Sequence, residues 1–323
     1  MDIIRLGVVG TGIIVKAMLA AVERVDGIKA VAACSRSEER GRGLGLEKVY
    51  TSLEEMLKDD DIDAVYIAVP NLLHYSRAKQ VLTSGKHCLL EKPFCVRLDE
   101  AEELIRFAKE KNLLLMETIP PAYGPNIRYL NNALSEIGRI RLVMSNFSQY
   151  SSRYDLLKKG ELPYIFDPNY GGGSLMDINY YNVYLNAFLF GRPETVLYHP
   201  NMMNGIDTSG VLTLRYPDFV STNAGAKDTS GENYFFIEGE QGYLKVIDGT
   251  DSIPEVKLVT KNREERFNRQ NEELRMDGEV SFFVNTLNSN DYSEAYRMLE
   301  VTKDAVWITQ KARKYAGILF PGD

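Results

Sequence analysis

Short apolar segments and amphipathic segments alternate along the first 118 residues of the chain. The apolar segments predict five strands, at Ile3–Val9, Lys29–Cys34, Ala64–Val69, His87–Leu90 and Leu113–Met116. Between them, apolar residues recur at spacings of three and four, as they do on one face of a helix. Because the strand segments are apolar throughout, helices should cover both faces of the sheet. The pattern predicts a doubly wound parallel sheet.

The pattern changes after Ile119, where Pro120-Pro121 and Gly124-Pro125 break the alternation and mark a domain boundary. Helical patterns follow near Asn126–Ile137, from Gly171-Gly172-Gly173 to about Phe190, and in the last 30 or so residues. Strand patterns and hairpin signals dominate from Glu194 to Val259. We therefore expect two domains, residues 1–118 and an α+β domain with a mostly antiparallel sheet over residues 119–323.

Composition narrows the class of protein. Lys and Arg total 38 against 45 Asp and Glu, a net charge of −7, and no basic stripe points to a nucleic-acid partner. A hydrophobic content of 44% excludes a disordered chain. Three scattered cysteines and three scattered histidines give no metal-ligand spacing, so no metal is expected. With no signal peptide pattern and no apolar run of membrane length, we expect a cytoplasmic protein.

The first strand leads into Gly10-Thr11-Gly12-Ile13, which opens the first helical pattern. Glycines at such a turn let the backbone approach a pyrophosphate, which binds the N–H groups at the start of the helix. Val15 stands where a third glycine would complete the fingerprint, so slightly looser helix–strand packing is expected. A tight turn without a ligand is the alternative interpretation.

The end of the second strand bears on the choice of cofactor. NAD enzymes usually place an acidic residue there to bind the ribose 2′-OH, whereas this chain has Cys34-Ser35-Arg36-Ser37. Hydroxyl and guanidinium groups suit a 2′-phosphate. Ser35 and Arg36 therefore favour NADP over NAD, unless Arg36 only begins a solvated helix.

Two motifs follow the predicted strands Ala64–Val69 and His87–Leu90, at the strand ends where ligands bind in such sheets. The first of these strands is followed by Pro70 and Asn71, with His74 three residues further on, and the second by Glu91-Lys92-Pro93. An ammonium beside a nicotinamide is placed to donate to a substrate oxygen. Taken alone, His74 is also typical of a packed or capping residue, and Glu-Lys-Pro of a solvated turn.

The second domain carries Gly171-Gly172-Gly173 before a helical segment in which Asp177 and Tyr181 are four residues apart, on one helix face. A phenol has a pKa of about 10, which a nearby ammonium lowers towards a useful range for proton transfer. Two structural interpretations compete with this one. Ser174 and Asp177 have the spacing of a capping box, and Tyr180, Tyr181 and Tyr184 form a possible core stripe.

The order of these motifs resembles the Gfo/Idh/MocA oxidoreductase family: GxG, PNxxH, EKP, then GGGxxxD with a Tyr four residues later. The resemblance covers nearly the whole chain. It implies a Rossmann domain followed by a domain whose large open sheet often mediates oligomers, so a homodimer or homotetramer is expected. Tyr181 in place of the His of many relatives is similar to the branch with glucose–fructose oxidoreductase, dihydrodiol dehydrogenase and xylose dehydrogenases, which tends towards NADP.

The resemblance also implies roles for individual residues. Lys92 binds the substrate oxygen and the cofactor, Glu91 contacts the ribose or holds Lys92, and Asp177 orients substrate hydroxyls. Tyr181 is then the acid–base residue, with Lys92 as the neighbour that favours its phenolate. Asn179 departs from the usual Gly, and the segment 118–121 lacks an Arg that many relatives carry.

The expected function is NADP-preferring hydride transfer between nicotinamide and a sugar-like or polyol-like alcohol or carbonyl. A sensor that binds nicotinamide without turnover would need the glycine turn but not Lys92, Asp177 and Tyr181. A third hypothesis keeps the cofactor and predicts a net non-redox reaction, such as glycoside cleavage through transient oxidation.

Overall fold

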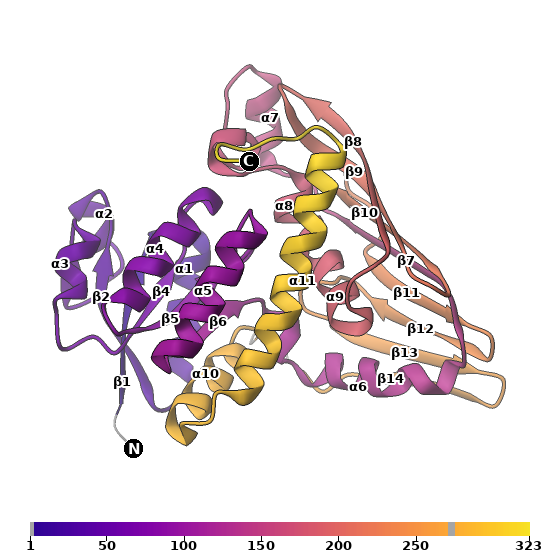
Figure 1. The fold of residues 1–323 in the computed structure, drawn as a ribbon, viewed down its shortest axis with the longest axis horizontal. Coiled ribbons are helices and arrows are strands. Elements are labelled where there is room, and N and C mark those ends of the chain that lie inside the picture. The colour runs from indigo at the N-terminus through magenta and orange to yellow at the C-terminus, as the bar shows by residue number, and fades with distance from the viewer. Residues whose placement is uncertain (1–2, 271–274) are drawn as a thin grey trace. The chain divides into compact units, whose positions relative to one another are not determined.

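The computed structural model describes residues 3–270 and 275–323. The chain divides into two units (Figure 1). Unit 1 comprises Met1–Pro120 and Met276–Glu300, and unit 2 comprises Pro121–Arg275 and Val301–Asp323. In the described residues, no helix has the length and apolar character needed to cross a membrane.

Unit 1 contains a six-stranded parallel sheet with strand order β3-β2-β1-β4-β5-β6. Its strands are β1 (Ile4–Val9), β2 (Ile28–Cys34), β3 (Lys48–Tyr50), β4 (Ala64–Ile67), β5 (His87–Glu91) and β6 (Leu115–Thr118). Every residue of β4 is buried, as expected for a strand covered on both faces. The order reverses between β1 and β4, which is the point where open parallel sheets bind ligands. The predicted doubly wound sheet is confirmed.

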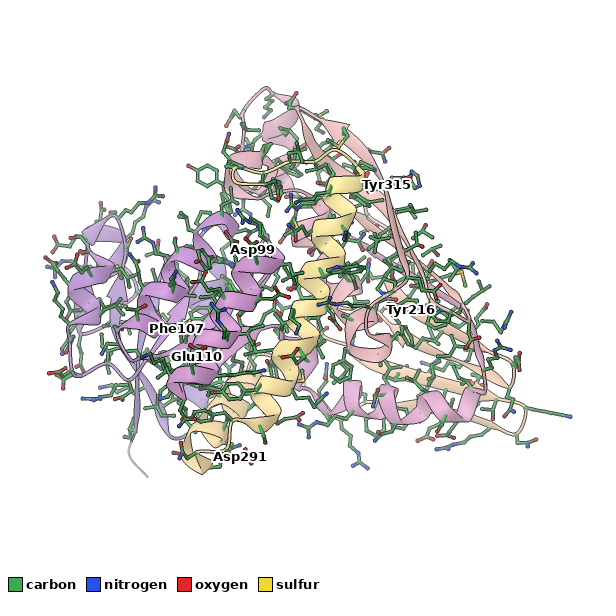
Figure 2. The ribbon with its side chains drawn as sticks, in the orientation of Figure 1. Asp99, Phe107, Glu110, Tyr216, Asp291 and Tyr315 are labelled. Atoms are coloured by element: carbon green, nitrogen blue, oxygen red, sulfur yellow. The ribbon has the colours of Figure 1, made fainter. Side chains whose placement is uncertain are left out.

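The helices of unit 1 follow the strands: α1 (Ile13–Arg24), α2 (Glu38–Arg42), α3 (Leu53–Leu57), η1 (Asn71–Leu73), α4 (His74–Thr83), α5 (Leu98–Lys111) and α10 (Asp277–Ser289). α1 buries the spaced apolar side chains that predicted it, including Met18 and Val22. α5 has acidic residues in its first turn, where carboxylates interact favourably with the helix dipole; Asp99, labelled in Figure 2, is one of them.

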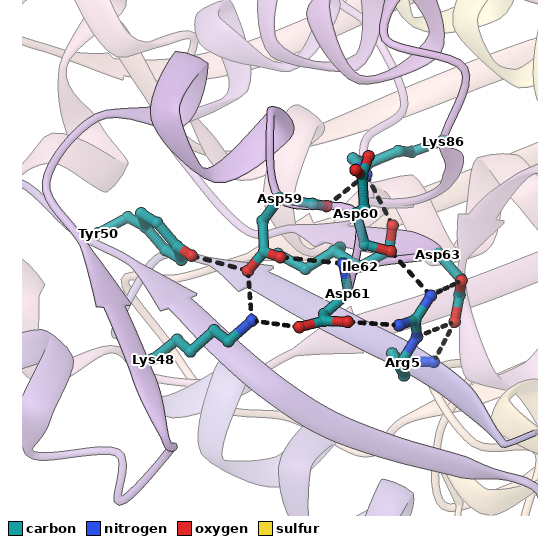
Figure 3. A network of polar contacts seen from close by, with 9 residues as sticks. All are labelled: Arg5, Lys48, Tyr50, Asp59, Asp60, Asp61, Ile62, Asp63 and Lys86. Carbon is teal, nitrogen blue, oxygen red and sulfur yellow. Dashed lines mark hydrogen bonds and ion pairs between the residues drawn. The ribbon is translucent and has the colours of Figure 1, made fainter.

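The amino-terminal ends of the unit 1 strands are held by a network of charges (Figure 3). Arg5 on β1 forms an ion pair with Asp63 before β4, with 2.8 Å between Nη2 and Oδ1. Lys48 on β3 lies 2.8 Å from Asp59, which also accepts a hydrogen bond from Tyr50. These bonds tie loops to strands at the edge opposite the predicted site.

Unit 2 contains an eight-stranded sheet with order β14-β13-β12-β11-β7-β10-β9-β8. The strands are β7 (Ile140–Ser148), β8 (Thr195–Met203), β9 (Ile206–Arg215), β10 (Val220–Ala226), β11 (Tyr234–Gly239), β12 (Gly242–Ile247), β13 (Glu255–Thr260) and β14 (Arg263–Phe267). β7 and β10 pair in parallel, and the other neighbours pair antiparallel. The predicted mostly antiparallel sheet is therefore confirmed.

The remaining helical segments are η2 (Pro120–Tyr123), α6 (Pro125–Ala133), η3 (Leu134–Ile137), α7 (Ser152–Lys158), η4 (Tyr164–Phe166), η5 (Pro168–Tyr170), α8 (Ser174–Asp177), α9 (Asn179–Phe190) and α11 (Ser293–Tyr315). Alternate residues of β11 and β12, such as Phe235 and Leu244, are buried in a core with Ile127 and Leu130 of α6 and Leu185 of α9. Burial alternates along these strands because one face of the sheet packs on helices.

Two features of the fold differ from the expectation. β3, α2 and α3 were not predicted, because segments of three to five residues are too short to show periodicity. Residues 276–300, placed in the second domain by the predicted boundaries of 1–118 and 119–323, belong to unit 1. The reason is α10, where Asp277 forms an ion pair with Arg24 of α1 and Val284 lies against Gly27.

Candidate active site

The glycine turn after β1 has the geometry that a dinucleotide requires. Gly10 has φ +118°, and a Cβ there would overlap the carbonyl oxygen of Ala68, so no larger residue fits. Gly12 is the N-cap residue of α1, and a Cβ there would meet open space. The first N–H groups of a helix lack intrahelical acceptors, so a phosphate can approach this turn closely. The glycine turn and the start of α1 therefore fit the pyrophosphate of a dinucleotide cofactor.

The residues next to this turn differ in how far their side chains are exposed to solvent. Ile13 is 81% exposed at the start of α1, and Thr11 is partly exposed. Val15, at the place of a third glycine, is fully buried beneath the turn.

The end of β2 presents the predicted cofactor-selecting residues to solvent. Arg36 is exposed, while Ser35 is half-buried and its Oγ accepts a hydrogen bond from the Ser37 backbone N–H at 3.3 Å. Ser37 begins α2 by accepting a bond from the N–H of Arg40. Among the described residues, no acidic side chain stands at the end of β2.

His74 is buried and contacts the backbone just after β4 and just after β5. It is 1% exposed, with Nδ1 2.8 Å from the Pro93 carbonyl oxygen and Nε2 2.8 Å from that of Val69. Burial lowers the pKa of this imidazole, and its contacts with backbone carbonyls oppose that shift. The structure thus gives His74 contacts with the two turns that carry Pro70-Asn71 and Lys92.

Glu91 fixes the turn on which Lys92 stands. Its carboxylate, 7% exposed, accepts hydrogen bonds from Tyr66 Oη at 2.5 Å, from Thr118 Oγ1 at 2.9 Å and from the Lys92 backbone N–H at 3.1 Å. Burial raises the pKa of this carboxyl group. These contacts tie the Glu91 carboxylate to the backbone of Lys92, whose own side chain is half-buried.

In unit 2, Gly172 and Gly173 are packing positions for the start of α8. A Cβ on Gly172 would overlap the carbonyl of Ile165, and one on Gly173 would overlap the carboxylate of Asp207. Asp207 is 1% exposed and accepts hydrogen bonds from the Leu175 N–H and from Tyr198 Oη, each at 2.7 Å. Burial raises the pKa of Asp207.

This arrangement corrects the capping-box interpretation of Ser174 and Asp177. The N-cap residue of α8 is Gly173, and Ser174 is buried without a side-chain cap bond. The Asp177 N–H, which the Ser174 side chain was expected to bind, donates instead to the Gly173 carbonyl at 3.1 Å. Asp207, 32 residues from Leu175 in the sequence, accepts the Leu175 N–H. Sequence patterns miss this cap because it is formed by tertiary structure.

Asp177 and Tyr181 belong to two successive helices. α8 ends at Asp177 and α9 begins at Asn179, with Ile178 at φ −100° between them. The ring of Tyr181 is half-buried and meets Phe147 of β7 edge-on, with centroids 5.7 Å apart. Tyr180 and Tyr184 are fully buried, so the core-stripe interpretation applies to them and not to Tyr181.

The departure at Asn179 is matched by a glycine on the neighbouring strand. Gly225 of β10 leaves room for Asn179, because a Cβ there would lie 2.5 Å from the Asn179 Cβ. The Asn179 amide donates to the carbonyl of Asn223 at 3.1 Å.

Lys227 is a candidate site residue that the sequence interpretation missed. It follows β10, is 7% exposed and forms an ion pair with Asp177. Its signal in the sequence is alternation: Ser221, Asn223, Gly225 and Lys227 lie on the buried side of the strand.

The predicted residues thus fall into two groups. In unit 1, all of them lie at the carboxyl-terminal ends of the parallel strands: Gly10, Thr11, Gly12, Ile13, Ser35, Arg36, Pro70, Asn71, His74, Glu91 and Lys92. In unit 2, Asp177 and Tyr181 lie at the α8–α9 junction, beside Lys227 and Phe147 respectively.

Comparison with known proteins adds a family relationship to this geometry. Residues 4–119 match the model of an oxidoreductase family with an NAD-binding Rossmann fold (Gfo/Idh/MocA). Residues 133–245 match the Gfo/Idh/MocA C-terminal domain. Both matches fall on the elements that carry the two groups of site residues.

Individual relatives span nearly the whole chain. The scyllo-inositol 2-dehydrogenase (NADP⁺) IolU of Bacillus subtilis is 32% identical over 326 residues, covering 99% of each protein. A D-xylose 1-dehydrogenase (NADP⁺) of Haloferax volcanii is 31% identical over 248 residues, 74% of each. The structure of a levoglucosan dehydrogenase with NADH and levoglucosan superposes with a TM-score of 0.84 at 18% identity, covering 98% of each chain.

Proposed function

Because the chain belongs to the Gfo/Idh/MocA oxidoreductase family, we propose that it transfers a hydride between a nicotinamide cofactor and a sugar-like or polyol-like alcohol or carbonyl. The observation that carries the proposal is the carboxyl edge of the unit 1 sheet. There the glycine turn leaves room for a pyrophosphate, and Lys92 stands on a turn fixed by Glu91. The named activities of the relatives support the substrate class.

The proposed reaction needs one proton to be managed beside the hydride. The bound nicotinamide supplies the hydride during reduction and accepts it during oxidation. Lys92 and Tyr181 donate hydrogen bonds to the substrate carbonyl oxygen and stabilise the charge that develops on it. Tyr181 then gives its phenolic proton to that oxygen, and takes it back in the reverse direction.

Asp177 orients the substrate in this proposal. A carboxylate accepts hydrogen bonds from hydroxyl groups, and the side chain of Asp177 remains 26% exposed. Hydroxyls next to the reacting carbon are therefore the groups that Asp177 would bind.

We further propose that NADP is the preferred cofactor. Arg36 is exposed at the end of β2 and Ser35 is half-buried beside it, which suits a 2′-phosphate. The names of two relatives, both NADP⁺ dehydrogenases, agree with this preference.

The test compares NADPH and NADH binding and then turnover with a panel of cyclitols and sugars. We expect tighter binding of NADPH, a large loss of that preference in Arg36→Ala, and a change in nicotinamide absorbance with at least one polyol. Substrate consumption without net absorbance change would replace the proposal with a non-redox reaction. Cofactor binding without turnover of any sugar or polyol would leave a sensor.

A further inference from the structure

One strand of unit 2 turns polar side chains towards the helices that carry Asp177 and Tyr181. Ser221 and Asn223 of β10 are fully buried, and Lys227 continues this side of the strand. The amide of Asn186 on α9 donates to Asn223 Oδ1 at 2.7 Å, and Asn182 donates to the carbonyl of Ala224 at 3.0 Å. Buried polar groups are costly unless they are paired, so these bonds fix α9 against β10.

Lys227 is the charged end of this polar row. Its backbone is held from both sides, since its N–H donates to Thr208 at 2.8 Å and its carbonyl accepts from Ser151 at 2.9 Å. The side chain is 9% exposed, and its ammonium forms an ion pair with Oδ2 of Asp177. An ammonium so poorly hydrated requires a charged partner.

The neighbouring acid is engaged elsewhere. Asp228 accepts hydrogen bonds from Thr208 Oγ1 at 2.7 Å and from Ser209 Oγ at 2.8 Å. These hydroxyls stabilise the Asp228 charge locally. The ion pair of Lys227 is therefore directed to Asp177, the residue proposed to bind substrate hydroxyls.

We propose that Lys227 is a positioning residue for substrate recognition, which holds Asp177 as a carboxylate in one orientation. The inference rests on the proposed function and narrows its substrate class. Lys227 offsets the charge of Asp177, so the pair is neutral as a whole and presents an oriented hydrogen-bond acceptor. Such a site favours uncharged polyols that carry a hydroxyl next to the reacting carbon.

The experiment measures kcat and KM of the full-length enzyme with its best polyol and with the analogue that lacks the adjacent hydroxyl. For Lys227→Met we expect kcat/KM to fall about 30-fold or more on the polyol, which corresponds to the lower end of the cost of breaking a buried charge pair. The loss should appear mainly in KM and shrink several-fold on the deoxy analogue. Lys227→Arg should recover most of the activity.

A matched control is Lys245→Met, which removes an ammonium from β12 of the same sheet. Lys245 forms an ion pair with Glu232, but the side chains are 32% and 72% exposed. We expect its kinetics to stay within about twofold of wild type, because exposed pairs contribute little. NADPH affinity should be unchanged in both lysine variants.

The double variant Asp177→Asn with Lys227→Met keeps the test decisive if the single lysine variant does not fold, since it leaves no unpaired charge. If Lys227 acts through Asp177, the double variant has the kcat/KM of Asp177→Asn alone. A further loss in the double variant, or an equal loss of the single variant on both substrates, would overturn the inference. If wild type oxidises or reduces no polyol, the proposed function fails instead.

Discussion

Two lysines flank strand β5, and their surroundings differ between the amino edge of the unit 1 sheet and the carboxyl edge, where we propose the active site. Lys86, at the amino-terminal end, is 8% exposed and donates to the carbonyls of Ile62 at 2.7 Å and Asp59 at 2.9 Å. Lys92, at the carboxyl-terminal end, is half-buried on a turn held by Glu91 and His74.

In our proposal, a lysine has a structural role at the amino edge of this sheet and a catalytic role at the carboxyl edge. At the amino edge, charged groups bond to the chain itself, as Arg5 does with Asp63. At the carboxyl edge, Glu91 and His74 hold the backbone on either side of Lys92. Ligands of open parallel sheets bind at that second edge.

The largest expected effect comes from exchanging these two lysines for methionine. Lys92→Met should lower kcat/KM by about 10²–10³-fold, the scale for one donor to a developing oxyanion, with little change in unfolding free energy. Lys86→Met should leave activity per folded molecule unchanged and destabilise the fold by roughly 1–3 kcal/mol, because two carbonyls lose their donor. Steady-state kinetics and urea unfolding of both variants measure this; matching profiles for the two would remove the distinction.

The two glycines of the turn after β1 allow cofactor binding to be separated from folding. Gly10→Ala should both destabilise the protein and abolish NADPH binding, because its Cβ would overlap Ala68. Gly12→Ala meets open space in the protein, so it should fold normally and weaken NADPH binding about tenfold or more. Cofactor titration and thermal unfolding report the two quantities separately. Unchanged NADPH affinity in Gly12→Ala would mean that no phosphate lies against this turn.

Substitution of two histidines should also separate a loss of activity from a loss of stability, with a smaller effect on kcat/KM. His74→Leu leaves the carbonyls of Pro93 and Val69 without their ring partner, so we expect roughly a tenfold loss of kcat/KM with about 1–3 kcal/mol of stability. His87 is the control, because its Nδ1 accepts the Leu114 N–H at 3.0 Å at the amino end of β5. His87→Leu should lose stability without losing activity. A similar kinetic loss in both variants would refute a positioning role for His74.

The smallest expected effect is in the pH dependence of stability. The pKa shift of Asp59, at the amino edge of the unit 1 sheet, is opposite in sign to that of Glu91, at the carboxyl edge. Hydrogen bonds from Lys48 and Tyr50 lower the pKa of Asp59, so this carboxylate stabilises the fold above about pH 4, its ordinary range, and the stabilisation is lost in acid. Burial raises the pKa of Glu91, so its contribution is present in acid and lost as the pH rises through the folded-state value.

Asp59→Asn should therefore flatten the acid side of the stability profile, by about 0.5–1 kcal/mol. Glu91→Gln should flatten the profile above about pH 4, the ordinary range of a Glu carboxyl. Urea unfolding across a pH series measures both. The sign assignments fail if Glu91→Gln is less stable relative to wild type at pH 7 than in acid.

The sequence was sufficient for the parts of the fold that depend on local periodicity. β1 and α1 were predicted because apolar segments and helical spacing are visible within a few turns. Gly10 was predicted from the GxG motif between them, and its φ of +118° agrees with that. α10 could not be assigned to unit 1, since its contacts with Arg24 and Gly27 join residues about 250 positions apart.

In the candidate site, too, residues in local motifs could be predicted, whereas residues placed by distant contacts could not. Lys92 and Asp177 stand in motifs, so their positions could be predicted. Asp207 and Lys227 act through tertiary contacts with α8, and Lys227-Asp228 looks like an ordinary surface pair of opposite charges in the sequence. Only the alternation of buried positions along β10 distinguishes Lys227.

The most direct test of the central claim follows a deuterium label from the transferable position of NADPH during reduction of the best carbonyl substrate. We expect one deuterium on the former carbonyl carbon for each cofactor oxidised, and a rate about 10²–10⁴-fold lower in Tyr181→Phe with unchanged NADPH affinity. Product that forms while the label stays on the cofactor, or a Tyr181→Phe rate equal to wild type, would contradict it.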